Sequence, residues 1–191
     1  MRKKVLVAVA HPDDETIWMG NMLLKNMDNW DTTIISLCRK DDPDRAPKFG
    51  KVCEIYKAKG VMSDLEDEKL NDIPLEETVS RLKRLAEKRY DMIFTHGKNG
   101  EYGHIRHKDV HNAINSMLRE KMMSCRKLFN FSYERKGKYA YPRKKSDMFM
   151  NSSRNLLEEK KRIIQDVYGF SKNGFEERCC RQAEAFNEVR L

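Results

Sequence analysis

The chain has no hydrophobic run long enough to cross a bilayer. Its first residues, MRKK, lead into a short apolar run, Val5 to Ala10, which ends in charged residues and shows no small-residue cleavage pattern. This argues against both a membrane anchor and an export signal. We therefore expect a cytoplasmic protein without a membrane span.

Paired cysteine motifs are also missing. The five cysteines form an odd set without a Cys-x-x-Cys spacing, which disfavours a disulfide framework and a thiolate zinc site. Such a set is typical of a reducing compartment. We assign no function to the adjacent pair Cys179 and Cys180.

Acidic residues are fewer than basic residues: 30 against 38, which gives a formal net charge of +8. This balance favours anionic partners, such as nucleic acid, an acidic membrane surface or a phosphorylated small substrate. The densest basic stretch, RKGKYAYPRKK (135–145), mixes tyrosines with cations as a nucleic-acid-binding loop does. No nucleic-acid motif accompanies it, so we expect a solvated hairpin or loop and no nucleic-acid partner.

Internal repeats and low-complexity linkers are absent, and 191 residues suit one α/β domain over 1–191. A polar loop is expected over 39–50, followed by a helix that ends at Gly60. Apolar patterning predicts strands over 5–10, 32–38, 91–95 and 128–133, and helices over 15–25, 51–59, 75–89, 104–118 and 152–168. Strands that alternate with helices predict a Rossmann-like, doubly wound sandwich with a mostly parallel sheet.

Two histidine-rich stretches follow strands of this sheet. HPDDE comes after the first strand and HGKNGEYGHIRHKDVH after the strand 91–95. Because sites form beyond the carboxyl ends of parallel strands, both stretches are expected at one edge. His11 and Asp14 are spaced as two ligands of a metal ion, and Asp13 is placed to take a proton from a water. Alternatively, the acids only stabilise the N-terminus of the following helix. This would explain Asp13 and Asp14 but not His11.

The second stretch offers more histidines than a metal site needs. On a helix, His104, His107 and His111 fall at i, i+3 and i+7 on one face, and the spacing alone does not select the ligand. Three ligands and an open position are typical of catalytic zinc.

Both motifs, VAVAHPDDE and the later THGKNGEYGHIRH, resemble those of the LmbE-like or PIG-L-like N-deacetylases, over roughly residues 4–118. The resemblance implies an LmbE-like fold and a hydrolase with one Zn²⁺ per chain. It implies removal of an acetyl group from an amino sugar, such as an N-acetylglucosamine conjugate.

The same resemblance implies individual roles. His11, Asp14 and His107 become the zinc ligands, and Asp13 becomes the general base. His104 becomes the group that, as imidazolium, stabilises the developing oxyanion or protonates the leaving amine.

Further residues are expected around this centre. Metal-bound histidines usually donate their second N–H to a carboxylate or carbonyl, and Glu101 and His96 are candidates for such supporting contacts. Tyr102 is either a supporting residue or a packing residue. For substrate binding the resemblance points to Arg45, with Arg39 as a rival.

Family members often carry His-x-Ser-Gln near the last helix, where this chain has Tyr168 to Lys172. The sequence therefore does not identify the amino-sugar substrate or its aglycone. The basic net charge favours an anionic substrate. A non-catalytic nucleic-acid or anion-binding module is the alternative from another class. A metal-dependent phosphoesterase is the alternative among enzymes, although it would want a second metal. The oligomeric state also stays open.

Overall fold

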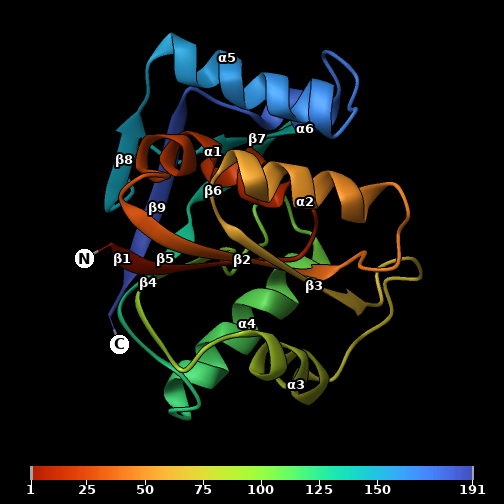
Figure 1. The fold of residues 1–191 in the computed structure, drawn as a ribbon, viewed down its shortest axis with the longest axis vertical. Helices are drawn as coiled ribbons and strands as arrows, with labels where there is room; N and C mark the ends of the chain where they lie inside the picture. The colour runs from red at the N-terminus through yellow and green to blue at the C-terminus, as the bar shows by residue number, and fades with distance from the viewer. Residues whose placement is uncertain (1, 191) are drawn as a thin grey trace.

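The computed structural model describes residues 2–190, in which one sheet holds seven strands (Figure 1). Five of them are parallel and lie side by side in the order β3-β2-β1-β4-β5, and β9 and β8 continue the sheet antiparallel. Their bounds are β1 Lys3–Val9, β2 Trp30–Cys38, β3 Lys59–Leu65, β4 Arg89–Thr95, β5 Ser124–Phe131, β8 Met148–Asn151 and β9 Ala183–Val189. The predicted doubly wound, mostly parallel α/β fold is confirmed.

Helices cover both faces of the sheet (Figure 1). One face carries α1 (Asp14–Asn26), α2 (Arg45–Ile55) and α5 (Arg154–Arg162), and the other carries α3 (Leu75–Leu85) and α4 (Ile105–Arg119). Strand β1 is buried on both sides because its side chains alternate between the two cores. Val5, Val7 and Val9 pack into the core under α1 and α2, and Leu6 and Ala8 pack into the core under α3 and α4.

The segment between β2 and β3 differs from the sequence-based expectation. Helix α2 begins at Arg45 and ends at Ile55, inside the stretch expected to be partly loop, and Gly60 lies in β3. The Asp42 carboxylate accepts hydrogen bonds from the backbone N–H groups of Asp44 and Arg45 at 2.9 Å, which stabilises the start of the helix. The predicted helix over 51–59 is therefore wrong in its bounds, and β3 was not predicted.

The last third of the chain also departs from its prediction. The expected strand over 128–133 is divided into β5 and β6 (Tyr133–Lys136), and β6 forms an antiparallel hairpin with β7 (Tyr139–Pro142). The basic stretch thus forms the expected exposed hairpin. The expected helix over 152–168 is α5 followed by a π-helical turn, Ile163–Val167, and a short helix α6 (Phe175–Cys179) precedes β9. Strand β8 has only four residues, and polar residues interrupt the apolar ones of β9, so neither strand has a recognisable pattern.

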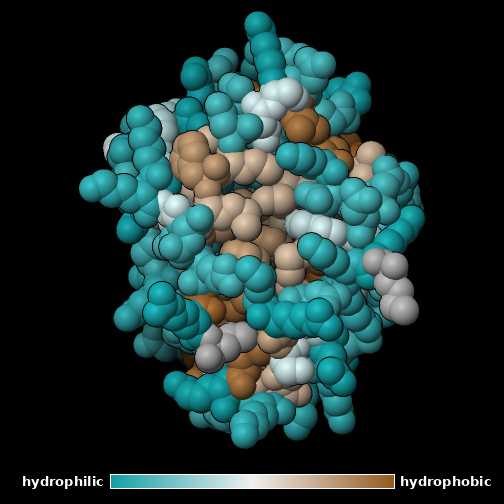
Figure 2. All heavy atoms as spheres, turned by 90° about the vertical axis from the view of Figure 1, so that its left-hand side faces the viewer, coloured by the Kyte–Doolittle hydropathy of each residue, from teal (hydrophilic) through white to brown (hydrophobic). Residues whose placement is uncertain are grey.

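Strand β8 is an edge strand of the sheet and pairs only with β9. Figure 2 shows this side of the molecule, with apolar surface gathered at the height of β8 and ringed by hydrophilic groups. The side chain of Phe149 in this strand is 42% exposed. Among residues 2–190, no helix is both long enough and apolar enough to cross a membrane.

A buried ion pair joins α5 to β9 beneath α1. Helix α1 is kinked at Met19, which leaves the backbone N–H groups of Asn21 and Met22 to donate to the Glu184 carboxylate at 2.8 and 2.9 Å. Lys160 Nζ lies 2.7 Å from the same carboxylate, and neither charged side chain is exposed to solvent. Glu184 therefore starts the second half of α1 as a cap supplied from a distant strand.

We predict that Lys160→Met destabilises the protein by about 3–5 kcal/mol, because it leaves the Glu184 carboxylate buried without its cation. The double variant Lys160→Met/Glu184→Gln should be less destabilised, because no unpaired charge remains. Urea denaturation measures both free energies of unfolding. Arg154→Ala, which removes an exposed ion pair with Glu158, serves as the control and should change little. A single variant as stable as the double one would contradict the prediction.

Candidate active site

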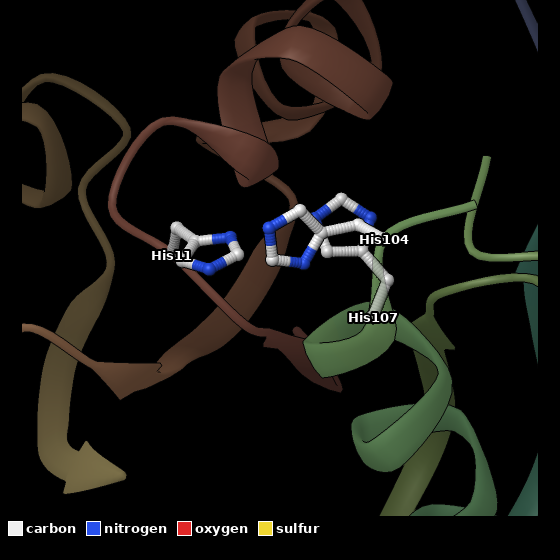
Figure 3. A group of neighbouring side chains, drawn as sticks. All are labelled: His11, His104 and His107. Carbon is white, nitrogen blue, oxygen red and sulfur yellow. The ribbon is translucent and has the colours of Figure 1, made fainter. Parts of the chain in front are cut away.

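Four loops meet at the edge of the sheet formed by the carboxyl ends of β1 to β4. The strand order reverses between β1 and β4, and an open α/β sheet forms its crevice at such a point. His11 comes from the loop after β1, and His104 and His107 come from the start of α4, with their rings turned toward one another (Figure 3). A cavity of about 330 Å³ opens here; it is lined by His11, Pro12, Asp13, Asp14, Ile17, Trp18, Arg39, Asp42, Arg45, Asp67, Tyr102, His104, Phe175 and Glu176.

The buried Asp14 carboxylate lies at the centre of these side chains. Its Oδ2 lies 3.1 Å from His11 Nδ1 and accepts the His11 backbone N–H at 2.9 Å. Its Oδ1 accepts Trp18 Nε1–H at 2.8 Å and lies 3.3 Å from His107 Nε2. Burial alone would raise the pKa of Asp14, but the surrounding imidazoles hold it well below its usual range. Asp14 is therefore an anion that three histidines face, because His96 Nε2 also lies 3.5 Å from Oδ2.

A second buried carboxylate, Glu101, fixes the orientation of His107. Glu101 Oε2 pairs with the Nδ1 atoms of His107 and, at 2.7 Å, of His96, while Oε1 accepts the Gly97 N–H at 2.7 Å. Burial would raise the pKa of Glu101, but its contacts with the two histidines lower it to about 2. Because Nδ1 of His107 is engaged by Glu101, its Nε2 points toward Asp14.

The Nε2 atom of His107 is the unsatisfied polar atom of the site. It is buried and has no hydrogen-bond partner among the described residues. Burial lowers the pKa of His107, so the imidazole is neutral and its Nε2 offers a lone pair. A buried polar atom without a partner is costly unless a ligand satisfies it. His107, Asp14 and His11 therefore present a nitrogen, an oxygen and a nitrogen suited to a metal ion.

His96 and His111 form hydrogen bonds with the backbone around the site. His96 Nε2 accepts the Ala10 backbone N–H at 3.0 Å, so its lone pair is already used. His111 Nδ1–H donates to the His96 carbonyl oxygen at 2.9 Å. All five histidines of the chain are thus gathered at this edge of the sheet, and Glu101 contacts both His96 and His107.

His104 caps the start of α4 at the mouth of the cavity. Its Nδ1 accepts the Arg106 backbone N–H at 3.3 Å, which leaves Nε2–H free to donate. Burial and the nearby His107 and His11 lower the pKa of His104 to about 4. His104 is therefore a neutral donor near pH 7 in this structure, and its expected role as an imidazolium beside the oxyanion stays a prediction. Tyr102 lies edge-on to His107 and Phe175, as a packing residue does.

Asp13 has a strained backbone, with φ of 116° at the residue that precedes α1. Strain of this kind persists where neighbouring contacts impose it and is common at functional sites. Here the Asp13 N–H donates to Glu15 Oε2 at 3.1 Å, and Tyr168 O–H donates to Glu15 Oε1 at 2.9 Å. Burial, and then the Asp14 charge, raise the pKa of Asp13 well above its usual range.

Two arginines border the cavity, and they differ in what they contact. Arg45 Nη1 lies 3.4 Å from Asp13 Oδ2, and its guanidinium sits 4.2 Å from the ring centroid of Phe170. Arg39 instead donates from Nε and Nη2 to a single oxygen of Asp67, at 3.0 and 2.9 Å. Arg45 thus contacts Asp13, whereas Arg39 is paired with Asp67. The expected contact of Arg45 with substrate stays a prediction.

Several contributors lacked a recognisable signal in the sequence. Asp67 lies in the acidic stretch DLEDE, where no acid is distinguished from its neighbours. Trp18 and Glu15 suit ordinary helix positions, and only their contacts with Asp14 and Asp13 reveal their part in the site. The sequence assigned no role to the segment from Tyr168 to Lys172. In the structure it reaches the site, because Tyr168 contacts Glu15 and Phe170 contacts Arg45.

In the described part of the chain, three groups of side chains place possible metal-ligand atoms within 4.8 Å of one another. These are His11 with His104 and His107, Asp14 with His96 and His107, and His11 with Cys38 and Asp67. The first two groups share His107. His96 and His104 each accept a backbone N–H with one ring nitrogen, so the donor atoms that these two groups leave for an ion belong to His11, Asp14 and His107.

Solved structures share this fold. N,N'-diacetylchitobiose deacetylase from Pyrococcus horikoshii is 17% identical, with a TM-score of 0.73 over 98% of this chain and 84% of that one. GalB, a 4-carboxy-2-hydroxymuconate hydratase from Pseudomonas putida, is 15% identical, with a TM-score of 0.70 over 99% and 97%. A conserved protein from Thermus thermophilus is 17% identical, with a TM-score of 0.64 over 97% and 94%. At these identities the likeness concerns the fold.

Sequence comparisons are more specific. An uncharacterized protein of Acanthamoeba polyphaga mimivirus is 29% identical over 121 residues, which cover 55% of this chain and 53% of the viral protein. The chain thus spans about half the length of that relative. A family model described as PIG-L, GlcNAc-PI de-N-acetylase, matches residues 6–118, from the first strand through α4. Since this match covers more than half of the residues and includes both histidine motifs, the chain belongs to the PIG-L family.

Proposed function

We propose that this protein is a zinc-dependent hydrolase that removes the N-acetyl group of an amino sugar, such as an N-acetylglucosamine conjugate. One observation carries the proposal: the buried, unpartnered Nε2 of His107 faces an Asp14 carboxylate that also meets His11. His11, Asp14 and His107 would hold one Zn²⁺. Two nitrogens and one oxygen are a ligand set typical of catalytic zinc, which acts as a Lewis acid at its open position.

Asp13 is the proposed general base. Its carboxylate lines the cavity beside Asp14, and a raised pKa suits a group that must accept a proton near neutral pH. Asp13 would take a proton from the attacking water. The Glu15 contact that fixes the backbone of Asp13 would keep the carboxylate aimed into the cavity.

His104 is the proposed donor to the substrate carbonyl oxygen. Its Nε2–H is free because Nδ1 accepts a backbone N–H, and a neutral imidazole stabilises developing negative charge through that hydrogen bond. A neutral His104 has no proton to spare for the leaving amine. Asp13 would therefore return to the amine the proton that it took from water.

The cavity suits a single sugar ring. Its volume of about 330 Å³ and its mixed acidic and basic lining favour a ligand rich in hydroxyl groups. A neighbouring groove of about 660 Å³ shares Arg39, Asp42 and Asp67 with it and would receive the remainder of the conjugate. The family is described as GlcNAc-PI de-N-acetylase, and the Pyrococcus horikoshii structure is named for N,N'-diacetylchitobiose.

Asp13→Asn should abolish turnover while the protein keeps its zinc, because the amide cannot accept the proton and Asp13 is not a proposed ligand. The expected loss in kcat is about 10²–10⁴-fold. Amine release from N-acetylglucosamine and its conjugates, together with elemental analysis of zinc, measures both quantities. Near-normal turnover in this variant would exclude Asp13 as the base.

His107→Ala should lose both the metal and the activity, because it removes the neutral nitrogen that faces Asp14. Zinc content should fall from about one per chain to near zero at a zinc concentration that saturates the wild type. Val110→Ala, which shortens a buried residue of the same helix, is a matched control for packing and should retain zinc. A metal-free wild type, prepared without chelators, would contradict the proposed function.

Arg45→Ala should raise KM for a conjugate by about ten-fold or more, because one charge-assisted hydrogen bond to substrate is lost. Zinc content should stay unchanged, since Arg45 does not contact the proposed ligands. Steady-state kinetics separates KM from kcat. An unchanged KM would place substrate recognition on another side chain.

A further inference from the structure

We propose that Asp67 is a positioning residue that makes His11 present its Nδ1 atom, rather than Nε2, to the metal ion. This inference rests on the proposed function, in which His11, Asp14 and His107 hold that ion. No sequence motif points to Asp67, which lies in the loop after β3 and outside both histidine motifs.

The geometry of His11 separates its two ring nitrogens. Nε2 lies 2.9 Å from Asp67 Oδ1, on the side away from Asp14, and Nδ1 lies 3.1 Å from Asp14 Oδ2. Both ring nitrogens face a carboxylate, but Asp14 is itself a proposed ligand of the ion and Asp67 is not. With an ion on Asp14, the proton of a neutral His11 would stay on Nε2 beside Asp67, and the lone pair would lie on Nδ1. Nδ1 is therefore the atom that faces the ion.

The arrangement mirrors the one around His107. There the Glu101 carboxylate takes the Nδ1–H, and Nε2 is left facing Asp14. Each proposed histidine ligand thus has its own buried carboxylate on the nitrogen that points away from Asp14. Such outer carboxylates fix the tautomer and ring orientation of a ligand and raise its basicity.

Asp67 is itself held rigidly. Its side chain is 7% exposed, and its second oxygen accepts two hydrogen bonds from Arg39. The loop that carries it is tied to α4 by the buried Arg106, which donates to the backbone oxygens of Glu66 and Asn71. With one oxygen on His11 and the other on Arg39, the Asp67 carboxylate is committed to holding these two side chains.

The Arg39 contact gives the inference a distinctive consequence. In Asp67→Asn the amide oxygen must face Arg39, because guanidinium only donates hydrogen bonds. The amide NH₂ would then face His11 Nε2 and donate to it, which moves the proton of a neutral His11 to Nδ1. Asp67→Asn would therefore place a proton on Nδ1, the proposed ligand atom of His11. Asp67→Ala would only remove the contact that orients the His11 ring.

Zinc affinity of the apoprotein, measured by competition with a chromophoric chelator, tests the inference. Asp67→Asn should weaken Zn²⁺ binding by about 10–100-fold, and Asp67→Ala by no more than Asp67→Asn. Glu176→Gln is the matched control: it removes a carboxylate of the same cavity that forms no hydrogen bond or ion pair with His11 or Arg39 in the described residues, and its affinity should change less than about two-fold. Thermal melting confirms that each variant is folded.

A second readout follows the tautomer directly. In ¹⁵N-histidine-labelled, zinc-loaded protein, NMR should show His11 with a protonated Nε2 and a metal-bound Nδ1. A signal from a zinc-bound Nε2 on His11 would overturn the inference, whatever the affinities are.

The outcomes separate this inference from the proposed function. If the wild type binds zinc and both Asp67 variants bind it as tightly as Glu176→Gln does, Asp67 does not position His11. If the Asp67 variants lose zinc as completely as His107→Ala, Asp67 is a ligand. If the wild type binds no zinc, the proposed metal site itself is wrong and the inference fails with it.

Discussion

Strand β1 pairs in parallel with β2 on one side and with β4 on the other, and this pairing brings the ends of distant segments to one place. It is possible because every residue from Val5 to Ala10 is apolar and fully buried, so that the strand serves both cores. Where the apolar run ends, the chain turns through His11 and Asp13 into α1. Because β4 ends alongside it, His96 and His107 reach the same carboxylate, Asp14. The site is thus a direct consequence of strand order.

The charges buried at this edge of the sheet are compensated by neighbouring side chains. Asp14 is surrounded by imidazoles, Glu101 lies between two histidines, and Asp67 is matched by Arg39 and His11. Each carboxylate would be unfavourable alone in the interior, and each is stabilised by a hydrogen-bonded partner. One atom, Nε2 of His107, lacks such a partner in the described residues. An otherwise satisfied polar network with a single open position is what a preorganised binding site requires.

The same sheet supports different chemistries in similar structures. A hydratase and a deacetylase both share the fold at TM-scores of 0.70 and 0.73. The fold therefore explains where a site forms, and the loop side chains determine what it does. In this chain the family match, the two histidine motifs and the donor set around Asp14 agree on one class of reaction. The basic hairpin β6–β7, by contrast, contributes none of the residues that line the cavity.

The sequence by itself determined the parallel core, the two histidine stretches and their common edge, because β1 and β4 are apolar runs that end in polar motifs. It did not reveal β3, the kink of α1 at Met19 or the antiparallel strands β8 and β9, whose patterns are short or interrupted. Only the tertiary structure decided which nitrogen of each histidine faces Asp14, that His104 is a neutral donor, and that Asp67 belongs to the site. Such properties depend on partners distant in sequence and on burial, and neither is encoded in local spacing.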